Sequence, residues 1–214
     1  MATSLDESEA SPAASLREKF WNLPNTITVV RLAVVPVLLA FPLFDGPVGS
    51  RIVAWLFIIS ALGDILDGVA ARWGQQVTRI GKLLDPLADK LTVATALIVL
   101  LNIDRIPEWG TPLVVVIIGR ELAVTGLRGI ASAGGQVVAA TWPGKVKALT
   151  QNVAIGAMLF PDPTLGLPAH RIGLILLCAA TALTLWSGYV YFADYFGAGS
   201  SAGKQKPPPK ETIA

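Results

Sequence analysis

The stretch GDILDGVAARWGQQVTRIGKLLDPLADK, residues 63–90, places four aspartates inside or beside the most apolar parts of the chain. Residues three or four positions apart lie on the same face of an α-helix. Asp64 therefore shares a helix face with Asp67, and Asp85 shares another with Asp89. The spacing predicts two helix ends that each present two carboxylates.

Four carboxylates that are held close together stay ionised only when cations neutralise them. Oxygen ligands without His or Cys favour a hard cation, Mg²⁺ or Mn²⁺ with Ca²⁺ as an alternative, over zinc. One or two ions would fit, and two ions about 4 Å apart are a known arrangement for displacement at phosphorus. A solvated ion pair at a helix end explains any single aspartate equally well, but not all four at this spacing.

Small residues accompany the aspartates. Gly68, Ala71 and Gly81 would let a bulky ligand approach the helix backbones. Arg72 supplies a forked donor that suits phosphate oxygens. The stretch therefore indicates a nucleotide diphosphate bound by metal and arginine at a membrane surface.

The composition is that of an integral membrane protein. Of 214 residues, 53% are hydrophobic and 15% are charged, with a mean hydropathy of +0.59, whereas a soluble domain has about 25% charged residues. The net charge of +2 gives no support to a nucleic-acid partner. Cys178 is the single cysteine, which excludes a disulfide framework, and it is interpreted as an apolar packing residue.

We predict an all-α integral membrane protein with six transmembrane helices and an N-terminal juxtamembrane amphipathic helix. Residues 1–14 are expected to be a disordered tail, 15–196 one membrane domain, and 197–214 a disordered basic, Pro-rich tail. Ser15 and Glu18 fit a capping box at the start of the amphipathic helix. The six apolar segments are Ile27–Phe44, Ile52–Leu66, Leu83–Leu101, Pro112–Ile130, Val146–Phe160 and Ile172–Phe192, of which the second continues to about Arg72 and the fifth starts earlier.

Lys and Arg predict the orientation, because cytoplasmic connections are rich in them. One side carries Arg17, Lys19, Arg72, Arg79, Lys82, Lys90, Arg128, Lys145, Lys147, Lys204, Lys206 and Lys210. The other side carries only Arg51, Arg105 and Arg171. We therefore expect a multi-pass protein of the cell membrane, with both termini and the aspartate motif in the cytoplasm.

The pattern Asp64-x₂-Asp67-Gly68-x₂-Ala71-Arg72-x₈-Gly81-x₃-Asp85-x₃-Asp89 resembles the signature of the CDP-alcohol phosphotransferases at every fixed position. The similarity extends to NLPNTITVVR (22–31), which looks like the first-helix motif of that family. The stretches GKLLDPLADK (81–90), GRELAVTGLR (119–128) and GKVKALTQ (144–151) are similar to its phosphatidylglycerophosphate synthase branch. The resemblance covers about residues 20–195.

The resemblance implies a homodimer with a polar cavity at the cytosolic face. It implies metal bound by the four aspartates, with Asp89 as the catalytic base. It implies that CDP-diacylglycerol lies against the following residues: Pro24, Asn25, Thr28, Gly68, Ala71, Arg72, Thr78 and Gly81.

The second substrate is expected to be sn-glycerol 3-phosphate, whose phosphate needs cationic contacts. The candidates are Arg31, Arg120, Arg128, Lys145 and Lys147. Lys145 and Lys147 could equally serve only to set the orientation, and Arg120 could pair with Glu121 or face the cavity.

The expected reaction transfers the phosphatidyl group from CDP-diacylglycerol to glycerol 3-phosphate and releases CMP. Sister enzymes that use inositol phosphate, phosphatidylglycerol or serine are the nearest alternatives. An ion-coupled transporter is a more distant alternative, because intramembrane carboxylates also occur in transporters. The carboxylates lie at one membrane face and no repeat is evident, which disfavours a transporter.

Overall fold

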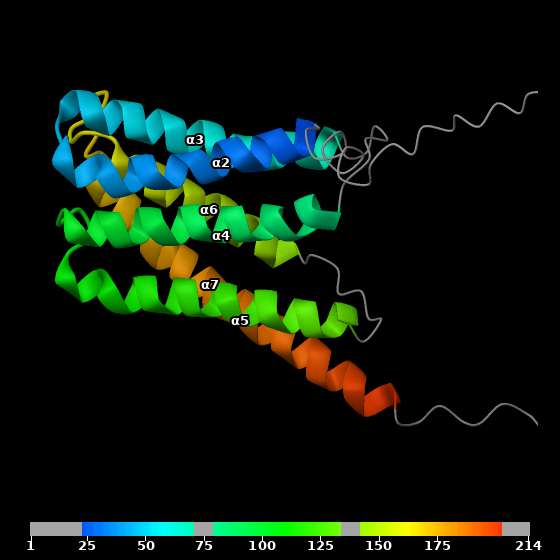
Figure 1. The fold of residues 1–214 in the computed structure, drawn as a ribbon. Coiled ribbons are helices and arrows are strands. Elements are labelled where there is room, and N and C mark those ends of the chain that lie inside the picture. The colour runs from blue at the N-terminus through cyan, green and yellow to red at the C-terminus, as the bar shows by residue number, and fades with distance from the viewer. Residues whose placement is uncertain (1–22, 71–78, 134–141, 203–214) are drawn as a thin grey trace, which may run out of the picture.

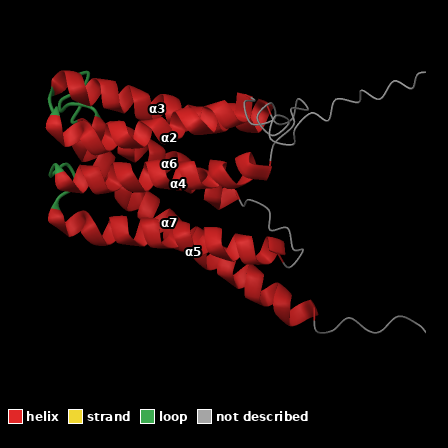
Figure 2. Ribbon diagram, in the orientation of Figure 1, coloured by secondary structure: helices red, strands yellow, loops and turns green. Residues whose placement is uncertain are grey.

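The computed structural model describes residues 23–70, 79–133 and 142–202. The predicted N-terminal tail, the amphipathic helix at Ser15 and most of the C-terminal tail lie outside these ranges. Within them the chain is helical, and no strand is formed. The long helices are joined at one end by short loops (Figure 2).

Each predicted apolar segment forms one long helix. These are α2 (Leu23–Ala40), α3 (Pro47–Ala70), α4 (Arg79–Asn102), α5 (Thr111–Ala133), α6 (Trp142–Leu159) and α7 (Ala169–Ala202). Two short 3-10 helices, η1 (Phe41–Leu43) and η3 (Glu108–Gly110), lie in the connections. α3 and α6 are longer than their apolar segments in the directions that we expected, and α7 continues past the expected domain boundary at residue 196.

Consecutive helices run in opposite directions, so the bundle has two different ends (Figure 1). We call the end with the α2–α3, α4–α5 and α6–α7 connections the turn end. We call the other, where α3 ends and α4 begins, the motif end. α2, α4 and α6 start at the motif end, and α7 finishes there, tilted away from the rest of the bundle. The most extensive contacts join α6 to α7 and α2 to α4.

The interior changes character between the two ends. The apolar core consists of residues from the half of each helix nearer the turn end, such as Leu38, Phe57, Leu97, Ile117 and Ile155. Toward the motif end the buried residues include polar ones: Thr28, Arg31, Ser60, Lys147 and Ser187 lie in that half, and Thr92, Glu121 and Gln151 lie near the middle of their helices. The apolar core therefore anchors the half nearer the turn end, and buried polar groups lie beside it and beyond it toward the motif end.

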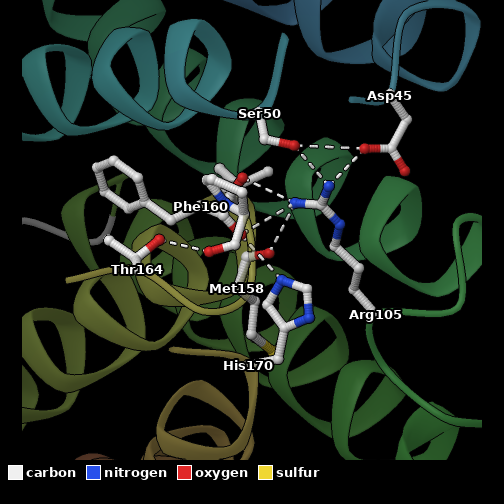
Figure 3. A network of polar contacts seen from close by, with 9 residues as sticks. Asp45, Ser50, Arg105, Met158, Phe160, Thr164 and His170 are labelled. Atoms are coloured by element: carbon white, nitrogen blue, oxygen red, sulfur yellow. Dashed lines mark hydrogen bonds and ion pairs between the residues drawn. The ribbon is translucent and has the colours of Figure 1, made fainter. Parts of the chain in front are cut away.

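Arg105, in the α4–α5 connection, ties the turn end together (Figure 3). Its Nη1 donates to the carbonyl oxygens of Met158 at 3.1 Å and Leu159 at 2.8 Å, in the last turn of α6. The last carbonyl groups of a helix have no partner within the helix, so an arginine satisfies them and also complements the helix dipole. Nη2 donates to Asp45 and, at 2.6 Å, to Ser50, and the guanidinium lies 5.0 Å from the centre of the Phe41 ring.

His170 belongs to the same end of the bundle. Its Nε2 lies 2.9 Å from the carbonyl oxygen of Phe160 (Figure 3). This contact joins the start of α7 to the residue that follows α6.

One helix in the described part of the chain, α7, has a stretch long and apolar enough to cross a membrane, residues Ala169–Phe196. Two shorter apolar stretches lie at Thr28–Leu43 and Pro47–Gly63. Six membrane spans are therefore not established by length and hydropathy.

Candidate active site

The aspartate motif is divided between two helix ends at the motif end of the bundle (Figure 1). Asp64, Asp67 and Gly68 lie in the last two turns of α3, and α4 carries Gly81, Asp85 and Asp89 in its first three turns. The backbone thus brings both halves of the motif to one end of the bundle.

Several predicted ligand residues lie beyond what the structure describes. Ala71, Arg72 and Thr78 fall in the undescribed segment 71–78. For a further group only the helical backbone is described: Pro24, Asn25, Asp64, Asp67, Gly68, Gly81 and Asp85. Their predicted contacts to metal and to CDP-diacylglycerol remain predictions.

Asp89 lines a polar cavity between four helices. The cavity is also lined by Arg31 of α2, Ser60 of α3, Thr92 of α4 and Asn152 of α6, with Phe57, Ala61 and Val93 as apolar neighbours. The Arg31 side chain is buried, so its charge is held inside the bundle close to the cavity. The cavity joins the predicted base to a predicted phosphate-binding residue.

The Ser60 hydroxyl is the polar group of this cavity that is able to hydrogen-bond a ligand. Its Oγ is buried and has no hydrogen-bond partner among the described residues. Thr92, in contrast, already donates to the carbonyl oxygen of Ala88 at 2.9 Å. A buried hydroxyl without a partner is unfavourable, so a hydroxyl-bearing ligand or a water would stabilise this position.

A network of charges adjoins Asp89 on its other side. Lys90 Nζ lies 2.8 Å from Asp89 Oδ2 and 2.5 Å from Glu121 Oε2. Glu121 also forms an ion pair with Lys147 of α6, and its Oε1 lies 3.2 Å from Arg120 Nη1. Arg120 Nη2 donates to Ser187 Oγ of α7 at 3.0 Å. We call Lys90, Arg120, Glu121, Lys147 and Ser187 the Glu121 cluster; it connects α4, α5, α6 and α7.

The structure separates the five predicted acceptor-phosphate residues. Arg120 and Lys147 belong to the Glu121 cluster, so of the two arrangements considered for Arg120 the pairing with Glu121 is the one that forms. Arg31 lies at the cavity instead. Lys145 is exposed in the first turn of α6, and Arg128 lies 5.7 Å from the centre of the Tyr191 ring.

Sequence reasoning did not assign a site role to Glu121, Lys90, Ser60 or Asn152. Glu121 carried the clearest signal, because an acidic residue within an apolar segment is costly to bury and usually has a function. Ser60 and Asn152 carried no comparable signal, since small polar residues are common in membrane helices.

The donor set of the aspartates fits a hard divalent cation. All four predicted ligands are carboxylates, placed on two helix ends that meet at one end of the bundle. The side chains that the structure describes contain no group of three His, Cys, Asp or Glu able to hold a metal, but three of the four aspartate side chains are outside that set.

Comparison with known proteins agrees with this arrangement. A family model for CDP-alcohol phosphatidyltransferases matches residues 21–186. The chain belongs to the CDP-alcohol phosphatidyltransferase family. The family predicted from the aspartate motif is thereby confirmed.

Curated relatives within this family carry related names. A protein of Bacillus subtilis (strain 168), named CDP-diacylglycerol–glycerol-3-phosphate 3-phosphatidyltransferase, is 41% identical over 185 residues, 81% of this chain and 94% of the relative. A protein of Mycobacterium tuberculosis (strain H37Rv), named probable phosphatidylglycerophosphate synthase, is 38% identical over 83% of each chain. A protein of Rickettsia felis with the same name as the Bacillus relative is 33% identical over 80% of this chain and 93% of the relative.

Proposed function

We propose that this chain is an enzyme of phospholipid biosynthesis that transfers the phosphatidyl group of CDP-diacylglycerol to sn-glycerol 3-phosphate. The products are phosphatidylglycerophosphate and CMP. The names of the relatives support this reaction. The structural observation that carries it is the position of Asp89, between a polar cavity and a cluster rich in cations.

Asp89 acts as the general base. Its carboxylate accepts the proton of the primary hydroxyl of glycerol 3-phosphate as that oxygen bonds to the phosphorus attached to diacylglycerol. The bond from this phosphorus to the oxygen that bridges to CMP breaks, and CMP leaves with the electron pair. Ser60 and Asn152 line the same cavity, whose volume of about 10 Å³ suits a single water or hydroxyl group, and in this proposal they hydrogen-bond the remaining hydroxyl of the acceptor.

Asp64, Asp67, Asp85 and Asp89 would hold one or two Mg²⁺ or Mn²⁺ ions. Such ions supply charge neutralisation at the pyrophosphate and at the leaving oxygen. The CDP group would lie against Gly68, Ala71, Arg72 and Gly81, with Thr78 near the phosphates and with Pro24, Asn25 and Thr28 along the start of α2. Thr28 is buried one turn before Arg31, which supports a polar lining at this point.

The phosphate of the acceptor binds to cations on α2, α5 and α6. Arg31 at the cavity, together with Arg120 and Lys147 in the Glu121 cluster, offers charge on both sides of Asp89. Lys145 and Arg128 lie nearer the surface of the motif end and would act at longer range, by attracting the anionic substrate.

In this proposal all six long helices cross the bilayer. They contain 18 to 34 residues, and a span needs about 20. Large apolar side chains are exposed on every one of them, for example Leu39, Ile59, Ile98, Val115, Val153 and Ile175, while polar residues are buried inside. That distribution suits a helix bundle that is surrounded by lipid. The motif end faces the cytoplasm, and the enzyme forms a homodimer.

The test is CMP release from CDP-diacylglycerol by the purified chain with Mg²⁺, when glycerol 3-phosphate, inositol phosphate, serine or phosphatidylglycerol is supplied in turn. We expect release with glycerol 3-phosphate, loss of activity in EDTA, and recovery with Mg²⁺ or Mn²⁺. Release only with a different acceptor would mean that the proposed reaction type is correct and that glycerol 3-phosphate is not the acceptor. No release with any acceptor, from folded protein, would favour the transporter.

A further inference from the structure

Glu121 is a buried carboxylate that gathers cations from three helices. Its side chain is 8% exposed, and its two oxygens contact Lys90 of α4, Lys147 of α6 and the neighbouring Arg120 of α5. A buried carboxylate costs several kcal/mol to desolvate, so it persists where partners compensate it closely. Here the cations that contact Glu121 outnumber its single negative charge.

The charges of the described side chains in the Glu121 cluster and of Asp89 do not balance. Lys90, Arg120 and Lys147 supply three positive charges, against the carboxylates of Glu121 and Asp89. One positive charge is left over, and the side chains that carry it are 4% to 30% exposed. Without Glu121, three cations would repel one another inside the bundle, and the long side chains would turn toward water.

The position of Arg120 is fixed by packing as well. A side chain at residue 188 of α7 would place its Cβ 3.3 Å from Arg120 Cγ, so Gly188 leaves room for the arginine stem. Ser187, the preceding residue, accepts a hydrogen bond from Arg120 Nη2. Arg120 Nε is buried without a hydrogen-bond partner among the described residues. An anion bound beside this donor would supply the missing hydrogen-bond partner.

We propose that Glu121 is a positioning residue, which holds Lys90, Arg120 and Lys147 together as a preorganised site for the phosphate of the acceptor. This inference rests on the proposed function and deepens it. A cluster assembled in advance does not have to order three long side chains when the substrate arrives, so affinity for the phosphate is higher. Lys90 contacts both carboxylates, so this phosphate site lies next to Asp89.

The experiment compares Glu121→Gln with wild type in CMP release at saturating CDP-diacylglycerol and varied glycerol 3-phosphate. We expect the KM for glycerol 3-phosphate to rise at least about tenfold, since charge-assisted contacts to the substrate are lost. The KM for CDP-diacylglycerol and kcat should change by less than about threefold. Inorganic phosphate, used as a competitive inhibitor, should lose affinity in parallel.

Two further variants keep the result decisive. Glu121→Asp retains the charge but withdraws the oxygens by one methylene, so an intermediate KM is expected, and this variant replaces Glu121→Gln if the latter does not fold. Glu108→Gln, which removes a carboxylate exposed in the α4–α5 connection, is the matched control and should leave KM unchanged.

An unchanged KM for glycerol 3-phosphate in folded Glu121→Gln or Glu121→Asp would overturn the inference while leaving the proposed reaction intact. A fall in kcat alone, together with less folded protein, would mean that Glu121 has a purely structural role. That result would also overturn the inference. Failure of wild type to use glycerol 3-phosphate would instead refute the proposed function. The wild-type measurement therefore separates the two.

Discussion

At the scale of single residues, Asp89 is the motif aspartate whose side chain the structure describes. It is 28% exposed, bound to Lys90 on one side and open to the cavity of Arg31 and Ser60 on the other. A base in such a position can receive an alcohol from the cavity while a lysine keeps its carboxylate oriented. For the other three aspartates, the structure describes only the backbone positions on α3 and α4.

Replacing Asp89 tests the base directly. Asp89→Asn removes the proton acceptor and weakens one oxygen ligand, so CMP release should fall by about 10²–10⁴-fold with little change in thermal stability. The matched control is Asp104→Asn at the turn end, where the positive φ of 58° suits asparagine as well as aspartate. Near-normal turnover of folded Asp89→Asn would contradict the assignment.

Sequence alone nominated candidate residues for the chemistry, but it did not predict how the cations are distributed between the cavity and the Glu121 cluster. Asp89 was predicted from spacing and resemblance, because a helix converts sequence spacing into a shared face. The pairing of Lys147 with Glu121 joins residues 26 positions apart on different helices, and no local pattern encodes it. Ser60 lines the cavity because α3 packs against its neighbours. No local pattern encodes this tertiary contact either.

At the scale of elements, the turn end is fastened by contacts between connections and helix ends. Arg105 joins the α4–α5 connection to the last turn of α6 and to the start of α3 (Figure 3). α6 and α7 are joined further by close packing at Gly173. These two features give two predictions about stability that are independent of catalysis.

Arg105→Gln should destabilise the protein. The substitution leaves carbonyl groups of Met158 and Leu159 and the carboxylate of Asp45 without their cation, at a cost of about 2–4 kcal/mol. The apparent Tm in detergent should fall by several degrees. Arg171→Gln, at an exposed position of the same end, should leave Tm unchanged. Equal Tm values for both variants would show that Arg105 is dispensable.

Gly173→Ala should loosen the α6–α7 pair. A Cβ at this position would collide with Met158 Cγ and lie 3.0 Å from the carbonyl oxygen of Ala154. Because backbone cannot yield as a flexible side chain does, we expect a loss of about 1–3 kcal/mol, read as a lower Tm. Gly129→Ala on α5, with nothing within 4 Å, should be neutral or stabilising. A neutral Gly173→Ala would contradict this packing.

The elements themselves were predictable because apolar segments and Gly- and Pro-rich turns alternate along the chain. All six segments became helices, with ends displaced by a few residues. The extension of α7 to Ala202 was not predicted, since Gly and Ser at 197–202 are poor helix formers in isolation.

At the scale of the whole molecule, the apolar core lies in the half of the bundle nearer the turn end. Arg51, Arg105 and Arg171 lie near the turn end, and Arg79, Arg128 and Lys145 lie near the motif end. This agrees with the asymmetry of Lys and Arg from which the orientation was predicted. Which helices are neighbours could not be predicted, because every segment is apolar on several faces and hydropathy does not select partners.

Labelling of single cysteines tests the orientation. In a Cys178→Ser background, which removes the exposed native thiol of α7, Glu108→Cys lies at the turn end and Trp142→Cys at the motif end. An impermeant maleimide should label Glu108→Cys in intact cells and Trp142→Cys only after permeabilisation. The reverse pattern would invert the topology, and labelling of both in intact cells would refute it.

The Glu121 cluster also bears on how the chain enters a membrane during synthesis. Lys90 emerges from the ribosome directly behind Asp89, and Arg120 directly ahead of Glu121. Lys147 is made last, when Glu121 is already in place to receive it. If α4, α5 and α6 cross the membrane as proposed, the order of translation gives each ion of the cluster an opposite charge that is already present or follows immediately.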